Sequence, residues 1–237
     1  MRLITPPRSL DEALLLAVSV ARYGRGLVAW SPAPRPPRPV ELYDMEACPY
    51  CRKVREALSE LDLDYVARTC GRGAKTRAAA IALGGKRQFP LLHDPNAGVT
   101  LYESEDIIDH LWSTYGPGRP RWERALHRVN TAASYVASSF RVRGFRARPG
   151  QRERVQPPEL LVLYNFEASP WCRRVREVLN ELDLHHHVKN VAKASPHRAE
   201  LVALGGKMQV PYLVDPNTGT AMYESADIVR YLERTYR

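Results

Sequence analysis

An internal repeat constrains the fold of this chain more than any other feature of its sequence. When the 237 residues are aligned with themselves at an offset of 121, residues 42–115 overlay residues 163–236 without a gap, and about half of the positions are identical. Identical stretches include Val54-Arg55-Glu56 with Val175-Arg176-Glu177. This period is far longer than that of a solenoid, so the sequence predicts a duplicated domain.

Each copy has the same predicted order of elements, β-α-β-α-β-β-α. In the first copy we expect strands over 40–45 and 63–68, helices over 49–61 and 75–83, hairpin strands over 90–93 and 99–102, and a helix over 104–115. Gly84-Gly85 ends the second helix. Ser104 is expected to cap the last one, because its hydroxyl can accept a hydrogen bond from a free backbone N–H.

The repeat divides the chain into four predicted parts. These are an N-terminal helix with a proline-rich linker (1–39), a first domain (40–116), a basic helical linker (117–159) and a second domain (160–237). Apolar residues recur at helical spacing over 10–23 and 121–140, namely Leu10, Leu14, Ala17 and Val18, and Leu126, Val129 and Ala133. A helix with such a stripe must bury it, so we expect both helices to pack on the domains and on each other, with their Arg residues outward.

Charge and composition limit the classes of function. The net charge is +9, but residues 116–158 alone hold ten Arg against two Glu, so the basicity lies mostly in connecting segments. Few aromatic residues are interleaved with these Arg residues, which argues against nucleic-acid binding and favours solvated surface or interdomain ion pairs. No apolar run reaches the roughly 18 residues of a membrane span. We therefore expect a soluble cytoplasmic protein without a membrane partner.

The chemistry of the chain centres on the motif Cys48-Pro49-Tyr50-Cys51, between the first strand and the first helix. At a helix N-terminus, free N–H groups and the positive helix end favour a thiolate at Cys48. Cys51, three residues on, can form or resolve a disulfide. A zinc site would need a second pair of ligands, and the chain offers only Cys70, Cys172 and scattered His. The motif therefore favours thiol chemistry and no metal.

Charged neighbours of the motif predict opposite shifts in the pKa of Cys48. Glu46 would raise this pKa, whereas Arg52 and Lys53 would lower it. The sequence leaves the net shift open.

The second copy differs at the same place. Its motif is Ser169-Pro170-Trp171-Cys172, with a hydroxyl where the first copy has its nucleophile. No disulfide can form within this motif. The second copy is therefore either a second site of a different kind or a structural copy.

The first motif resembles the dithiol active site of glutaredoxins, in the thioredoxin superfamily. Gln88-Phe89-Pro90 resembles the segment with a cis-proline in that superfamily, and Tyr102-Glu103-Ser104 is similar to the Glu-Ser motif of the N-terminal domain of glutathione transferases. The resemblance implies an α/β fold with two tandem thioredoxin-like domains, each preceded by a helical segment. It also implies that Pro90 and Pro211 are cis. The all-helical C-terminal domain of a transferase is missing.

The resemblance further implies that glutathione is bound as co-substrate. The Phe89 backbone would pair with its cysteinyl part, and Glu103 and Ser104 would hold its γ-glutamyl end. Ser169 resembles the serine with which some transferases stabilise a glutathione thiolate. The implied glutathione-binding residues are Tyr50, Gln88, Phe89, Pro90, Glu103 and Ser104 in the first copy, and Gln209, Val210, Pro211, Glu224 and Ser225 in the second.

The favoured function is a glutathione-dependent thiol–disulfide oxidoreductase. Cys48 would attack a disulfide or a glutathione mixed disulfide, and Cys51 or a second glutathione would resolve the intermediate. One alternative is a glutathione transferase that uses Cys48 or Ser169, if the helical segments supply a hydrophobic pocket. Another is a non-catalytic adaptor that binds glutathione, or an iron–sulfur cluster through Cys48. The sequence leaves the oligomeric state open.

Overall fold

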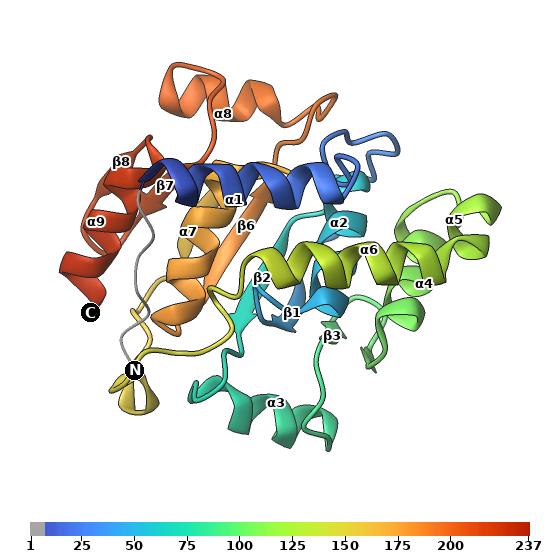
Figure 1. The fold of residues 1–237 in the computed structure, drawn as a ribbon, viewed down its shortest axis with the longest axis horizontal. Helices are drawn as coiled ribbons and strands as arrows, with labels where there is room; N and C mark the ends of the chain where they lie inside the picture. The colour runs from blue at the N-terminus through green and yellow to red at the C-terminus, as the bar shows by residue number, and fades with distance from the viewer. Residues whose placement is uncertain (1–7) are drawn as a thin grey trace.

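Strands from both repeats join into one continuous sheet. In the computed structural model, which describes residues 8–237, the sheet has eight strands in the order β4-β3-β1-β2-β6-β5-β7-β8 (Figure 1). The first seven residues of the predicted N-terminal segment lie outside the described residues. The described part of the chain contains no helix that is both long and apolar enough to cross a membrane.

The elements follow the predicted order in both repeats. The first repeat consists of β1 (Val40–Asp44), α2 (Pro49–Glu60), β2 (Tyr65–Thr69), α3 (Thr76–Gly84), β3 (Leu91–Asp94), β4 (Val99–Leu101) and α4 (Ser104–Tyr115). The second consists of β5 (Leu161–Asn165), α7 (Pro170–Glu181), β6 (His186–Asn190), α8 (Arg198–Gly205), β7 (Tyr212–Asp215), β8 (Thr220–Met222) and α9 (Ser225–Tyr236). The mixed α/β fold that the sequence predicts is therefore present.

One expected helix cap is wrong. Ser104 is the first residue of α4, and the N-cap is Glu103, whose backbone has a positive φ of 61°. Glu224 occupies the same place before α9, with φ of 66°. This left-handed backbone is uncommon for residues other than glycine, and it recurs at the same position in both repeats.

The two repeats meet through β2 and β6. These strands pair antiparallel, with Tyr65 opposite Val188 and Ala67 opposite His186. Each would otherwise be an open edge with unpaired N–H and C=O groups, and their pairing removes both edges. The sequence predicts two domains but not this shared sheet.

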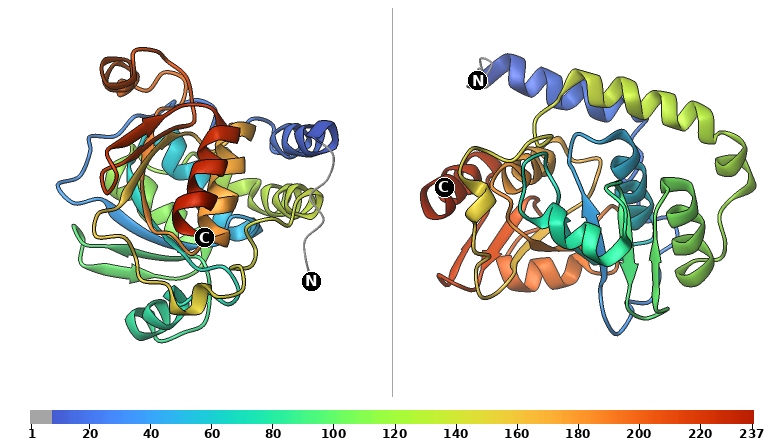
Figure 2. Two further views of the ribbon diagram at one scale, coloured as in Figure 1. Left: turned by 90° about the vertical axis from the view of Figure 1, so that its left-hand side faces the viewer. Right: turned by 90° about the horizontal axis from the view of Figure 1, so that it is seen from below.

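The helical segments comprise α1 (Arg8–Ala21), α5 (Arg121–Ala125), α6 (His127–Phe140) and the short 3₁₀ helix η1 (Gln151–Glu153). Helices α1 and α6 lie together on one side of the sheet (Figure 2). Figures 1 and 2 show α1 and α6 side by side and antiparallel, and α6 packs on α2 while α1 packs on α7. The predicted packing of these helices on the repeats and on each other is confirmed.

The predicted packing face of these helices is right in part, since Val18 of α1 is fully buried as expected. Leu10, Leu126 and Val129, which were expected to be buried, are at least half exposed. The buried residues of α6 are instead the small side chains Ser134, Ala137 and Ser138. Small residues let α6 approach α2 closely, so its larger apolar side chains point away from the sheet.

The expectation that the Arg residues of these helical segments lie outward is right in part. Arg121, Arg124 and Arg128 are exposed, whereas Arg22 and Arg141 form buried ion pairs. Arg22, after α1, binds Glu56 of α2, and Arg141, after α6, binds Glu177 of α7. Glu56 and Glu177 are equivalent positions of the repeat. The two helical segments therefore make matching contacts with the two repeats. The alternative expectation, ion pairs between parts of the chain, holds for these side chains.

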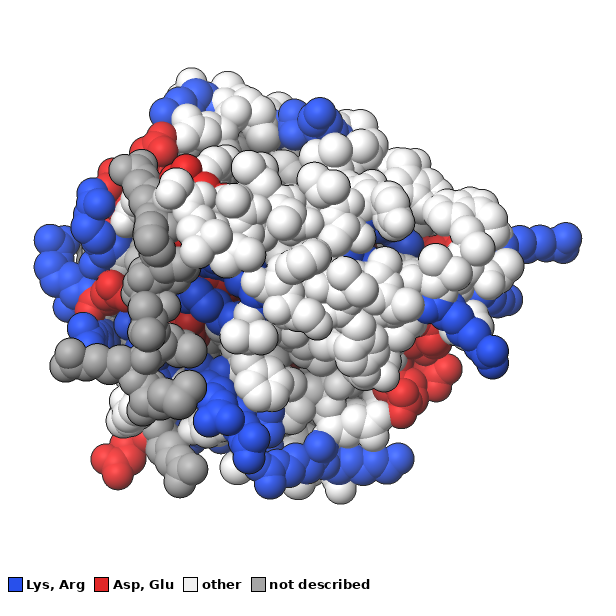
Figure 3. Space-filling model, viewed as in Figure 1, with Lys and Arg blue, Asp and Glu red and all other residues white. Residues whose placement is uncertain are grey.

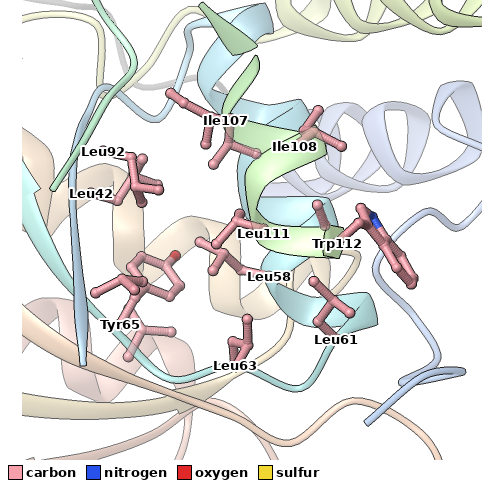
Figure 4. Close-up of a cluster of buried hydrophobic side chains, with 14 of the residues drawn as sticks. Leu42, Leu58, Leu61, Leu63, Tyr65, Leu92, Ile107, Ile108, Leu111 and Trp112 are labelled. Atoms are coloured by element: carbon pink, nitrogen blue, oxygen red, sulfur yellow. The ribbon is translucent and has the colours of Figure 1, made fainter. Parts of the chain in front are cut away.

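The apolar core of the first repeat lies between the sheet and the helices α2 and α4 (Figure 4). Leu42 of β1, Leu58 of α2, and Leu111 and Trp112 of α4 are fully buried there. A similar cluster around Leu163, Leu179 and Leu232 fills the second repeat. These contacts hold α2 and α7 so that each helix begins directly after a strand of the sheet.

Candidate active site

Cys48 is the N-cap of α2. Its backbone is extended (φ −74°, ψ 124°), Pro49 occupies the first helical position, and the Cys48 sulfur accepts a hydrogen bond of 3.4 Å from the Cys51 N–H. Proline suits this position because its missing N–H would have no partner there. The sulfur thus lies where helix N–H groups are free to stabilise a negative charge.

The surroundings of Cys48 favour its thiolate. A hydrogen bond from the Cys51 side chain lowers the pKa of Cys48 from 9.0 to about 7, helped by the backbone N–H groups of Cys51 and Tyr50 and by the charge of Arg55, against the effect of burial. Burial and the neighbouring Cys48 hold the pKa of Cys51 well above its usual value. The two thiols therefore have different roles available, a nucleophile at Cys48 and a proton donor at Cys51.

The charge that lowers the pKa of Cys48 is that of Arg55, which was not singled out from the sequence. Lys53 donates to Glu105 and to Thr131. Glu46 is bound by Arg176 of the second repeat, at 3.0 and 3.1 Å. Glu46 and Lys53, which were expected to shift the pKa of Cys48 in opposite directions, are thus paired with other side chains.

Arg55 holds the loop that leads into the motif. Its guanidinium donates to the carbonyl of Glu46 at 3.0 Å, to Asp44 at 2.5 Å and, across the boundary between repeats, to Glu167 at 3.0 Å. All of these side chains are buried. Arg176 makes the equivalent contacts with Asn165 and Glu46. Each repeat therefore contributes one buried Arg that binds a Glu of the other repeat.

Helix α6 covers the start of the motif. The Ser134 hydroxyl donates to the carbonyl of Pro49 at 2.7 Å, and the Tyr135 hydroxyl donates to the Tyr50 hydroxyl at 2.7 Å. The two Tyr rings meet edge to face, with centroids 5.4 Å apart. Tyr50 is 40% exposed, so an aromatic side chain from each of two helices borders the solvent side of Cys48.

The structure brings Phe89 to Cys48 and groups Gln88 with Glu103. Phe89 packs on the small apolar cluster that contains Cys48 and Cys51. Gln88 donates to the carboxylate of Glu103, and the start of α4 at Ser104 is buried. The peptide bonds before Pro90 and Pro211 are both cis, which confirms that prediction.

The second repeat reproduces this arrangement with Ser169 in the place of Cys48. Ser169 is the N-cap of α7, and its hydroxyl accepts from the Cys172 N–H at 3.3 Å. Gln209 donates to Glu224 at 2.6 Å, as Gln88 does to Glu103. Cys172 is fully buried, and burial raises its pKa to about 11.

Val210 and the buried Ser225 keep their places beside Gln209, Pro211 and Glu224. Val210 packs on an apolar cluster in which Val191 stands at the position equivalent to Cys70. Ser225 begins α9, as Ser104 begins α4. Apart from Ser169, which replaces Cys48, the second repeat therefore keeps the arrangement of these residues.

Three site residues were missed from the sequence. Arg55 and Arg77 recur as Arg176 and Arg198 in the second repeat, so their identity between copies was a usable signal. Arg77 lies over the Phe89 ring at 4.9 Å and donates to the carbonyl of Cys70. Nothing in the sequence marks Tyr135, because only tertiary packing brings α6 to Tyr50.

The remaining candidate residues were the other cysteines and any side chains that could bind a metal ion. All four cysteines are free and buried, and Cys70 packs in the same cluster as Cys48 and Cys51. Burial raises the pKa of Cys70 well above its usual value, so it behaves as a small apolar residue. Within residues 8–237, no group of three or more His, Cys, Asp or Glu side chains is arranged to hold a metal ion.

Comparison with known proteins finds matches in sequence and in structure. A stretch of 70 residues is 38% identical to the glutathione S-transferase-like protein tpcF of Aspergillus fumigatus, and covers 30% of this chain and 31% of that protein. A structural match to a Leishmania protein, TDR1, described as a unique trimeric glutathione transferase, covers 84% of this chain and 68% of that one, at 16% identity and a TM-score of 0.31.

A protein-family model also matches the chain. The glutathione S-transferase N-terminal domain matches residues 42–120 and again residues 163–237, which together form more than half of the chain. Both matched segments contain the strand, the N-capped helix and the cis-proline described above. The chain therefore belongs to the glutathione S-transferase N-terminal domain family, within the thioredoxin superfamily.

Proposed function

We propose that the protein is a glutathione-dependent thiol–disulfide oxidoreductase that acts through Cys48. The observation that carries this proposal is the pair of thiols at the start of α2. Cys48 has its pKa lowered to about 7, and the Cys51 side chain hydrogen-bonds it. Thiol–disulfide exchange is fastest for a nucleophile whose pKa lies near the ambient pH.

The proposed reaction has two exchange steps. The Cys48 thiolate attacks the glutathione sulfur of a mixed disulfide, so that a Cys48–glutathione disulfide forms and the substrate leaves as a thiolate that takes up a proton. A second glutathione, as its thiolate, then attacks the glutathione sulfur of this intermediate. Oxidised glutathione leaves, and the Cys48 thiolate is restored.

Resolution by a second glutathione is favoured over resolution by Cys51. Cys51 is fully buried, and its pKa lies well above the usual value, so little of it is thiolate at neutral pH. Its side chain instead stabilises the Cys48 thiolate that leaves in the second step. In this proposal Cys51 improves the leaving group and is not required for turnover.

The glutathione would lie along the Phe89-Pro90 segment. Its cysteinyl part would pair with the Phe89 backbone, and its γ-glutamyl end would meet Glu103 and Ser104 at the start of α4, where free N–H groups suit a carboxylate. Gln88 and Glu103 are hydrogen-bonded to each other in the structure, so binding would exchange this bond for bonds to the ligand.

The test compares two reactions on the same preparations. Reduction of a glutathione mixed disulfide and conjugation of glutathione to a model electrophile are measured for the wild type, Cys48→Ser and Cys51→Ser. We expect reductase activity in the wild type, its loss in Cys48→Ser and retention of a substantial part in Cys51→Ser. Conjugation without reduction in the wild type would contradict the proposal.

A glutathione transferase is the second candidate. It is favoured by the family match and by the aromatic pair Tyr50 and Tyr135, which offers an apolar surface next to Cys48. In this case Cys48 or Ser169 would stabilise the glutathione thiolate while the thiolate attacks an electrophile. Tyr135→Ala should then weaken binding of the electrophile, and leave the affinity for glutathione unchanged.

We further propose that residues 40–116 and 160–237 act as tandem glutaredoxin-like domains, joined by the segments 1–39 and 117–159. The second domain is proposed to stabilise the first, with Ser169 and Cys172 outside the redox reaction. All four cysteines are free, which suits a reducing compartment, so we propose that the protein acts in the cytoplasm.

A further inference from the structure

The outward faces of α1 and α6 form a broad uncharged surface. Figure 3 shows this white area across the side of the molecule where Figure 1 places the two helices. Its exposed side chains are Ala13, Leu16, Val20 and Tyr23 from α1 and the turn that follows it, and Val129, Ala132, Val136 and Phe140 from α6. We call these eight residues the α1–α6 face.

The α1–α6 face is larger than the apolar patches that monomeric proteins usually leave open. Val20 is 74% exposed and Tyr23 86% exposed, and the remaining large side chains of the face are about half exposed. Together they expose on the order of 800 Å², which is close to the area that each partner contributes to a standard protein interface. Monomers rarely expose more than a few hundred Å² in one patch.

The symmetry of the α1–α6 face suits a second copy of the chain. Helices α1 and α6 occupy equivalent places before the two repeats, and they run antiparallel side by side (Figure 2). The face therefore has an approximate two-fold axis of its own. When two such faces meet about a molecular two-fold axis, each helix contact recurs in nearly equivalent form, and four helices form a bundle.

The charges beside the face do not favour a membrane surface. Helices that lie in a lipid interface carry rows of Lys and Arg along their polar side. Here α1 begins at Arg8 and has Asp11 and Glu12 in its first turns, and α6 contains Arg128. Neither helix contains Lys or a row of basic residues. Asp11 is already paired with Arg141 and Arg174.

We propose that the α1–α6 face is the contact surface of a homodimer, in which α1 and α6 of two copies pack as a four-helix bundle. The dimer buries the apolar stripes that each copy leaves exposed. This proposal does not depend on the thiol chemistry, because assembly is measured without glutathione or substrate.

Sedimentation velocity of the full chain over a range of concentrations tests the proposal. We expect the wild type to sediment as a species of twice 26.9 kDa. The variant Val20→Glu/Val136→Glu places a charge at two points of the face, and should weaken self-association by at least about 100-fold. The milder Val20→Ser/Val136→Ser should weaken it less. Circular dichroism checks that each variant is folded.

The matched control places the same charges elsewhere. Val202 and Leu204 of α8 are 41% and 54% exposed and lie outside the α1–α6 face, so Val202→Glu/Leu204→Glu should remain dimeric. A monomeric wild type, or a folded Val20→Glu/Val136→Glu variant that stays dimeric, would overturn the proposal. So would a monomeric wild type that binds vesicles of phosphatidylserine and phosphatidylcholine.

Discussion

The reactivity of Cys48 depends on its closest neighbours. The Cys51 side chain makes the largest contribution that lowers the pKa of Cys48, ahead of the helix N–H groups and Arg55. Burial of Cys48 acts in the opposite direction. A change at Cys51 therefore reports on the nucleophile itself, even though Cys51 is fully buried.

The pH profile of Cys48 alkylation should follow this arrangement. The thiolate reacts, so in the wild type the rate should rise with pH through about 7 and then level off. Cys51→Ala removes the hydrogen-bond donor and should raise the pKa of Cys48. If this pKa rises by one unit, the alkylation rate at neutral pH should fall about fivefold. Cys51→Ser keeps a donor and should shift the profile less.

Alkylation by iodoacetamide, followed by mass spectrometry of the Cys48 peptide, measures this profile. Cys172→Ser is the control, since its side chain lies in the other repeat and should leave the profile unchanged. An identical midpoint in wild type and Cys51→Ala would show that the Cys51 side chain does not stabilise the thiolate.

The two repeats should differ in redox function because Cys48 has a sulfur atom where Ser169 has an oxygen atom. Cys48→Ser should abolish disulfide reductase activity, since a serine hydroxyl stays protonated and cannot form a disulfide. Ser169→Ala and Cys172→Ser should change the activity little. If a folded Cys172→Ser variant lost as much activity as Cys48→Ser, the second repeat would be the working site.

At the scale of elements, buried ion pairs fix the helical segments to the repeats. Arg22 binds Glu56 with both side chains almost fully buried, and this interaction lowers the pKa of Glu56 against the effect of burial. Arg141 and Glu177 form the equivalent pair in the other half. One pair connects the end of α1 to α2, and the other connects the end of α6 to α7.

Removing one partner of these pairs should destabilise the protein strongly. Glu56→Gln leaves the Arg22 charge buried without a carboxylate, so the free energy of unfolding should fall by about 3–5 kcal/mol. Glu177→Gln should cost a similar amount. Urea denaturation followed by circular dichroism measures both.

The control for these variants is an exposed ion pair. Asp227→Asn removes the partner of Arg230, and both side chains are about half exposed or more, so the change should stay within about 1 kcal/mol. Equal losses from Asp227→Asn and Glu56→Gln would contradict a structural role for the buried pairs.

In the whole molecule, backbone hydrogen bonds and buried ion pairs connect the two repeats. The β2–β6 pairing makes one sheet, and Arg55–Glu167 and Arg176–Glu46 cross between the repeats. Separating the repeats would expose two strand edges and break these ion pairs between the repeats. The two halves should therefore unfold together.

Single-tryptophan variants can test this coupling. One variant keeps Trp112 in the first repeat and the other keeps Trp171 in the second, with the other tryptophans replaced by Phe. We expect both fluorescence signals to change at the same urea concentration in the full chain. Two separate midpoints, in variants of equal overall stability, would mean that the repeats unfold independently.

Much of the candidate site followed from local sequence. Cys48 had to lie at a helix start because Pro49 follows it and an apolar strand precedes it, and the cis-prolines followed from the resemblance at Gln88-Phe89-Pro90. The contacts of Arg55 could not be predicted, because Glu167 lies 112 positions away. Tyr135 reaches Tyr50 only because α6 packs on α2.

The duplicated unit, the order of its strands and helices, and the difference between Cys48 and Ser169 can be read from the chain, because repeats, helix starts and turns depend on neighbouring residues. Long-range packing, in contrast, pairs β2 with β6 in one sheet, buries Arg22 and Arg141, and leaves the α1–α6 face exposed. Helical periodicity shows that a helix has two unlike faces, but which face is buried depends on how closely its neighbours can approach. Here the small residues Ser134, Ala137 and Ser138 allow the closest approach, so they face α2 and the larger apolar side chains do not.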